Sequence, residues 1–204
     1  TQAGVGTPAP ALFAAAGLEG AAFATGLPSQ SDTQAALVGN ANVAAALGAP
    51  SNALGLVVLG GGVDDDASAT SITFTSEAIF SLDVAQLALT QSLFVGLLDS
   101  EDDGAGFDSL AFTILREGVE IAGEVFVSLP AARAYFDDHV LALGDLLTGV
   151  GGALDLIFRL SLTSDDPGAA FRTNLIVGAT PVPEPGTALL LAAGLVALAR
   201  RRRR

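Results

Sequence analysis

The chain has 204 residues and a formal net charge of −13, and it contains no cysteine, methionine or tryptophan. Residues 1–185 hold all 22 acidic residues and only four of the nine arginines, which leaves this part at −18. Such a strongly acidic protein repels nucleic acid and anionic lipid, so the composition excludes a nucleic-acid-binding role. The lack of cysteine excludes disulfides and cysteine-ligated metal sites.

The composition divides the chain into three parts. Residues 1–53 are rich in alanine and glycine, and we expect short helices at 33–38 and 43–47. Residues 54–180 form the expected globular core, and residues 181–204, here called the tail, combine prolines, an apolar run and arginines. We call residues 1–180 the body. Because residue 1 is threonine, we expect that a secretion signal preceded it.

Alternation of apolar and polar residues predicts antiparallel strands from residue 54 onward. The expected strands cover 54–59, 72–82, 87–97, 107–116, 119–127, 153–163 and 171–177. Glu117 and Gly118 form the expected turn of a hairpin, and in the strand after it Val119, Ile121, Val125 and Val127 share a face. Regular strands with one half-buried face predict a mainly β fold, an antiparallel β-sandwich or jelly-roll-like ectodomain with short helices.

One helix is expected between these strands, at residues 129–140, because Pro130 lies near its first turn and apolar residues recur at helical spacing. His139, the only histidine, follows Asp137 and Asp138 at the expected helix end. A serine-histidine-aspartate hydrolase needs such neighbours, but the chain has no Gly-x-Ser-x-Gly elbow. We therefore expect a surface histidine favoured by the helix dipole, solvated aspartates and no catalysis.

An acidic segment is the candidate cation site. Carboxylates recur around Gly104, and hard cations such as Ca²⁺ prefer such oxygen ligands; the candidates are Asp99, Glu101, Asp103 and Asp108. The segment is not an EF-hand loop, because Leu110 stands where a bidentate glutamate is required. The alternative is that these residues, with the acidic stretches 64–66 and 165–166, keep an exported protein soluble. We expect no other cofactor.

The tail places three unlike segments in order. Pro183 and Pro185 lack backbone N–H groups and favour an extended spacer. The next segment is uncharged and rich in helix formers, which predicts a transmembrane helix: Thr187, Ala188, Leu189, Leu190, Leu191, Ala192, Ala193, Gly194, Leu195, Val196, Ala197, Leu198 and Ala199. A cytoplasmic basic stop follows: Arg200, Arg201, Arg202, Arg203 and Arg204.

The apolar segment is short for a membrane span. At about 1.5 Å per residue it reaches about 20 Å, whereas a bilayer core is roughly 30 Å thick. Arginine side chains that snorkel and a bilayer that thins would close this gap. The alternative is a buried C-terminal core helix, but five consecutive arginines are typical of a stop-transfer signal rather than of a core helix.

The order of these segments resembles the PEP-CTERM sorting signal of Gram-negative, often biofilm-forming bacteria. The sorting motif consists of Val182, Pro183, Glu184 and Pro185. The resemblance implies that an exosortase, a membrane-embedded enzyme, recognises the tail and processes it near this motif. It also implies passage through the inner membrane and a final place at the cell surface or outside the cell. The catalytic residues would then belong to the exosortase.

Three classes of function compete for the body. The first is a surface or matrix protein associated with biofilm or exopolysaccharide, the second a calcium- or carbohydrate-binding module, and the third a secreted hydrolase. Sugar-binding platforms usually use exposed tryptophan or tyrosine rings. The chain has no tryptophan and one tyrosine. We therefore expect the first class, with extracellular polysaccharide as a partner of the body.

Overall fold

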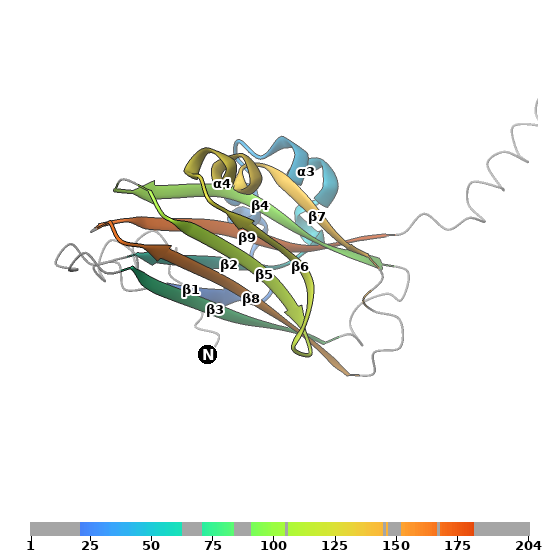
Figure 1. Cartoon of the computed structure of the whole chain (residues 1–204). Helices are drawn as coiled ribbons and strands as arrows, with labels where there is room; N and C mark the ends of the chain where they lie inside the picture. The colour runs from blue at the N-terminus through green and yellow to red at the C-terminus, as the bar shows by residue number, and fades with distance from the viewer. Residues whose placement is uncertain are drawn as a thin grey trace, which may run out of the picture.

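The computed structural model describes residues 21–62, 71–83, 91–104, 106–144, 146, 152–166 and 168–181. Within these ranges the chain forms two antiparallel β-sheets and a few short helices (Figure 1). The prediction of a mainly antiparallel β fold is therefore confirmed. The expected transmembrane helix lies outside the described residues. Among the helices that the structure does describe, none is long and apolar enough to cross a bilayer.

The larger sheet has five strands in the order β1-β2-β9-β4-β7. In this spatial order the strands are β1 (Ala21–Thr25), β2 (Ala53–Gly62), β9 (Ala170–Pro181), β4 (Gln91–Asp103) and β7 (His139–Gly144). The central strand β9 pairs with β2 from Ala170 to Gly178 and with β4 from Ala170 to Pro181. Strand β9 is thus held on both sides over most of its length.

The smaller sheet has four strands in the order β3-β8-β5-β6. These strands are β3 (Ile72–Asp83), β8 (Ala153–Ser164), β5 (Ser109–Arg116) and β6 (Val119–Phe126). The predicted hairpin of β5 and β6 is confirmed. Its two turn residues, Glu117 and Gly118, have φ angles of 51° and 79°, as a two-residue type I′ turn requires.

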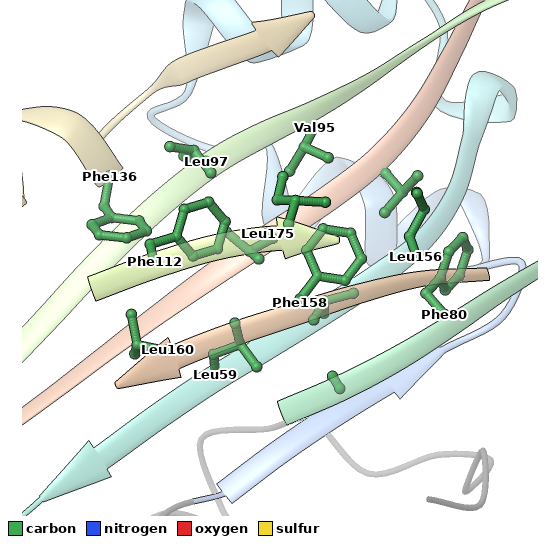
Figure 2. Packing of buried hydrophobic residues seen from close by; sticks show 14 of the residues in the cluster. Leu59, Phe80, Val95, Leu97, Phe112, Phe136, Leu156, Phe158, Leu160 and Leu175 are labelled. Carbon is green, nitrogen blue, oxygen red and sulfur yellow. The ribbon is translucent and has the colours of Figure 1, made fainter. Parts of the chain in front are cut away.

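Residues of both sheets contribute to one hydrophobic cluster (Figure 2). Strand β8 alternates strictly, so that Leu154, Leu156, Phe158, Leu160 and Leu162 are all buried. Phe112 lies with its ring centroid 5.3 Å from that of Phe136, and Phe136 lies 5.4 Å from Phe171. Each fully buried side chain of this size contributes about 1.5–3 kcal/mol relative to exposure. This cluster is therefore the main source of stability.

A second cluster lies on the other face of the larger sheet. Helices α2 (Gln30–Ala36) and α3 (Ala41–Leu47) form this layer, and the short 3₁₀-helix η1 (Pro50–Asn52) leads from them into β2. Val43 and Leu47 of α3 pack with the sheet residues Phe94, Leu98 and Ile176. The boundary predicted at residue 53 stays a prediction, although α2, α3 and β1 all lie against or within this sheet.

Two predicted boundaries that bear on the candidate sites are wrong. The helix predicted at 129–140 ends at Phe136, and this helix, α4 (Leu129–Phe136), is followed by β7. His139 thus begins a strand because residues 139–144 pair with β4. Residues 99–103, interpreted as part of an acidic loop, continue β4, since β9 offers them partners down to Ala170.

The outward face of β6 is more apolar than a half-buried strand predicts. Val119 and Val125 of β6 are 66% and 63% exposed, and Val127, directly after the strand, is 78% exposed, whereas Phe126 is buried. The register between β5 and β6 shifts between Ile114 and Leu115. Both faces of the segment carry apolar residues, so the period alone did not identify Phe126 as the side chain that enters the core.

Candidate functional site

Strand β9 delivers the chain to the tail, which makes its last residues the described part of the candidate sorting site. Pairing of β9 with β2 ends at Gly178, which lies opposite Ala53. Pairing with β4 continues to Pro181, which lies opposite Gln91. Among the described residues, the segment Ala179–Pro181 therefore pairs with β4 alone. It is the last part of the sheet before the sorting motif.

Close packing fixes β9 almost to its end. A Cβ atom added at Gly178 would lie 2.5 Å from Phe94 Cε1 and 2.8 Å from Leu47 Cδ1. A side chain at this position would therefore force the ring of Phe94 or the side chain of Leu47 to shift. Ala179 is 1% exposed. The body is therefore tightly packed up to two residues before Pro181.

The residues predicted to act in sorting, from Val182 to Arg204, lie outside the described residues. Their expected arrangement as an extended spacer, a transmembrane helix and a basic stop stays a prediction. What the structure adds is their point of attachment, a central strand of the larger sheet. The tail thus follows directly on the folded body.

The calcium candidates have protein partners of their own. Asp99, Glu101 and Asp103 lie on the last part of β4, where Glu101 forms a salt bridge with Arg172. Asp103 Oδ1 accepts a hydrogen bond from the Gly104 N–H at 2.9 Å. Asp108, in the loop after β4, donates its backbone N–H to Thr163 O at 2.9 Å. Across the described ranges, no group of three or more His, Cys, Asp or Glu side chains is arranged to hold a metal ion.

Several negatively charged side chains lie close together near the last residues of β4, and their mutual repulsion is unfavourable. The pKa of Asp99 is raised above its ordinary value, first because its carboxyl is partly withdrawn from water. A hydrogen bond with Asn40 acts in the opposite direction, and the negative charges of Asp137, Glu101 and Asp138 raise the pKa further. Asp102, on the same strand segment, is paired with Arg133 at 2.6 Å.

His139 and the two aspartates before it contact other groups of the protein. Its Nδ1 lies 3.1 Å from Tyr135 O, and its ring packs edge-on against Tyr135 with centroids 5.0 Å apart. Asp137, expected to be solvated, accepts a hydrogen bond from the Ser100 hydroxyl at 2.8 Å. Asp138 Oδ1 accepts the backbone N–H groups of Asn42 and Val43 at 2.9 and 3.0 Å. The two carboxylates thus bind β4 and the start of α3.

The contact of Asp138 with α3 is a feature that sequence reasoning missed. Asn40, the N-cap residue of α3, directs its side-chain amide to Ala36 O at 3.2 Å. Asp138 caps the helix in its place, across 96 positions of the chain. A carboxylate on the first free N–H groups of a helix also interacts favourably with the helix dipole. No local pattern could have shown this pairing.

Comparison with known protein families agrees with the residue pattern of the tail. The family described as the PEP-CTERM protein-sorting motif matches residues 181–204. No curated protein matches the chain closely enough to be counted as a relative. The matched region begins at Pro181, the last residue of β9. The chain is therefore a PEP-CTERM domain-containing protein.

Proposed function

We propose that the chain is exported, held in the inner membrane by its tail, and processed there by an exosortase. The single observation that carries this proposal is the match of residues 181–204 to the sorting motif. The apolar run 187–199 would span the membrane, and the arginines 200–204 would stay in the cytoplasm. The body would then lie outside the cytoplasm and be released to the cell surface or beyond.

We further propose that the body is a two-layer β-sandwich that acts by binding or by occupying space in an extracellular matrix, without catalysis. The shared cluster of inward side chains from both sheets supports a sandwich. The pairing of Asp102, Glu101, Asp137 and Asp138 with other parts of the protein supports a structural role for these groups. The partner that corresponds to this role is exopolysaccharide in a biofilm.

Calcium binding is the alternative for the acidic end of the body. Asp103 and Gly62 both pair with Ala170, so the acidic stretches near 99–108 and 165–166 lie at one end of the sheets. Their common position favours an electrostatic role there. A rise in Tm at millimolar calcium that EDTA reverses would support this alternative, and an unchanged Tm would remove it.

Alanine substitution of the motif tests the sorting proposal. Replacing Pro183, Glu184 and Pro185 with alanine in cells that contain an exosortase should leave full-length protein in the membrane fraction. The wild-type chain should lose its tail, which mass measurement of the mature C-terminus would show. A matched control replaces Asp165 and Asp166, two exposed residues of a distant turn. Equal processing of motif variant and wild type would contradict the proposal.

A further inference from the structure

In the described part of the chain, the two sheets have four edge strands, which differ in how well they resist pairing with another chain. An edge strand presents a row of N–H and C=O groups, and natural proteins keep it from pairing by short length, by bulges or by inward-facing charges. The edge strands of the larger sheet, β1 and β7, have five and six residues. Their short length therefore protects them.

Strand β6, at one margin of the smaller sheet, is protected in two other ways. Its register with β5 shifts between Ile114 and Leu115, which disrupts the regular spacing of its backbone groups. Glu124 lies opposite the buried Phe112 and so shares the inward face of the sheet. A strand added at this margin would cover the Glu124 carboxylate, and burying an unpaired charge is costly. Strand β6 is thus a poor edge for pairing.

Strand β3, at the other margin of the smaller sheet, has none of these protections (Figure 1). Its twelve residues all pair with β8 in one continuous register, and they include neither proline nor lysine. Glu77, near the middle of the strand, is held by Arg159 at 2.7 Å. Ile79, on the same outward face, is 43% exposed. Among the described strands, β3 pairs with β8 alone, so its free edge is long, regular and partly apolar.

A second copy of β3 fits this edge in an antiparallel arrangement. A two-fold axis through Ile79 places this side chain opposite its own copy, and Glu77 opposite Ser81 of the second copy. On the inward face, Ala78 then lies opposite Phe80. Because a strand rises about 3.3 Å per residue, the two Glu77 residues are about 13 Å apart along the strands. This separation exceeds the screening length of about 8–10 Å at physiological salt.

The neighbouring registers bring negative charges together. An axis through Ala78 leaves the two Glu77 residues only about 7 Å apart along the strands, and an axis through Glu77 places them directly opposite each other. An axis through Phe80 places Glu77 opposite Asp83. Like charges directly opposite each other destabilise a pair of strands. The charges of β3 therefore favour the axis through Ile79.

We propose that two copies of the chain associate through antiparallel pairing of their β3 strands, with Ile79 on the two-fold axis. The two smaller sheets then form one continuous sheet. Residues 75–83 of each copy take part, which is fewer than the roughly 20–30 residues a side of a standard stable interface. The dimer is therefore weak and forms where copies are crowded, as in the matrix proposed above. The pairing does not depend on the sorting function.

Cysteine cross-linking of the full-length chain in detergent micelles tests this inference. The chain contains no cysteine, so Ile79→Cys supplies one thiol per copy. Residues directly opposite each other on antiparallel strands have Cα atoms about 4.5–5.5 Å apart, which suits a disulfide. Under mild oxidation, Ile79→Cys should form a linked dimer about 10-fold faster than Val125→Cys, because pairing raises the effective concentration of the thiols. Val125, on β6, is the exposed control position, and non-reducing electrophoresis measures both rates.

A mixture of two single-cysteine variants tests the register. Positions 77 and 81 of the two copies are opposite each other in the proposed dimer, so Glu77→Cys should cross-link to Ser81→Cys when one of them carries an affinity tag. Each variant alone should cross-link only at the rate of Val125→Cys. Fast cross-linking of Glu77→Cys with itself would place the axis at Glu77 and overturn the proposed register.

A charge on the axis gives a test without cysteine. Ile79→Lys places two ammonium groups opposite each other and removes an apolar pair, so the dissociation constant of the dimer should rise by about 5-fold or more. Val125→Lys adds the same charge on β6 and should leave the constant unchanged. Sedimentation equilibrium measures both constants, and circular dichroism shows that the variants are folded. A dimer that Ile79→Lys leaves as stable as the wild type, or equal cross-linking of Ile79→Cys and Val125→Cys, would overturn the inference.

Discussion

The two sheets share one interior but differ in what covers their outer faces. The larger sheet is covered on its outer face by α2 and α3, so β2 and β9 are buried on both sides. The smaller sheet carries polar pairs on its outer face. Thr73 and Thr163 form a hydroxyl pair at 2.8 Å, as do Thr75 and Ser161, and Arg159 binds Glu77 at 2.7 Å.

This difference assigns different tasks to the two sheets. Exposed pairs such as Glu77 and Arg159 contribute little to stability, about 0–1 kcal/mol. The smaller sheet therefore stabilises the body mainly through its inward face. The larger sheet gains contacts on both faces, and it is this sheet that contains β9. A strand that pairs on both sides over most of its length thus leads to the sorting motif.

The largest effect is expected at the interior that both sheets share. Phe112 on β5 is fully buried, and Phe112→Ala should lower the free energy of unfolding by about 3–5 kcal/mol because it leaves a cavity beside Phe136. Thr113, the next residue, lies on the outer face, and Thr113→Ala should cost at most about 1 kcal/mol, the range of β-propensity. Urea unfolding followed by circular dichroism measures both. Similar losses would mean that the outer face of the smaller sheet is not solvated.

A smaller effect is expected where α3 covers the larger sheet. A Cβ atom added at Gly96 would overlap Val43 Cγ1 and lie 2.8 Å from Ile176 Cγ2. Gly96→Ala should therefore lower the free energy of unfolding by about 1–3 kcal/mol through overpacking. Gly26→Ala is the control, because a Cβ atom there meets no atom within 4 Å. If Gly96→Ala were neutral, α3 would not lie close against β4 in solution.

The same difference between the sheets explains which strands could be predicted. The strands of the smaller sheet alternate because water covers one face, and β8 was predicted at 153–163 against the observed Ala153–Ser164. Strand β2 is apolar on both faces, and its prediction stopped at Leu59 because the three glycines 60–62 were interpreted as closing the strand, although pairing with β9 continues to Gly62. The edge strands β1 and β7 were missed because five or six residues carry too little periodicity.

The candidate site shows the same limit. The sorting motif could be read from the sequence because it is a linear signal whose parts follow one another in the tail. Its attachment to a central strand could not, since β9 pairs with segments 67 or more residues earlier in the chain, the smallest separation being that of Asp103 and Ala170. The role of Asp138 was missed for the same reason. Its partners, Asn42 and Val43, lie 96 and 95 residues earlier in the chain.

The smallest effect is expected at the carboxylate that fixes the start of α3. Asp138→Ala removes the acceptor of the Asn42 and Val43 N–H groups and should lower the free energy of unfolding by about 1–2 kcal/mol, as loss of a helix cap does. Asp138 has a φ of 51°, and Glu117, with the same φ in an exposed turn, supplies the control Glu117→Ala. This control should be nearly neutral.

Asp138→Asn then separates charge from hydrogen bonding. Asparagine keeps one acceptor oxygen and tolerates the positive φ, so the loss should fall between those of Asp138→Ala and the wild type. Hydrogen exchange of the Asn42 and Val43 amides should quicken in the order wild type, Asp138→Asn, Asp138→Ala, with the amides of β8 unchanged. Equal exchange in all three proteins would mean that α3 is held by Val43 and Leu47 alone. The cover of the larger sheet would then depend on packing, as the interior does, and not on this long-range cap.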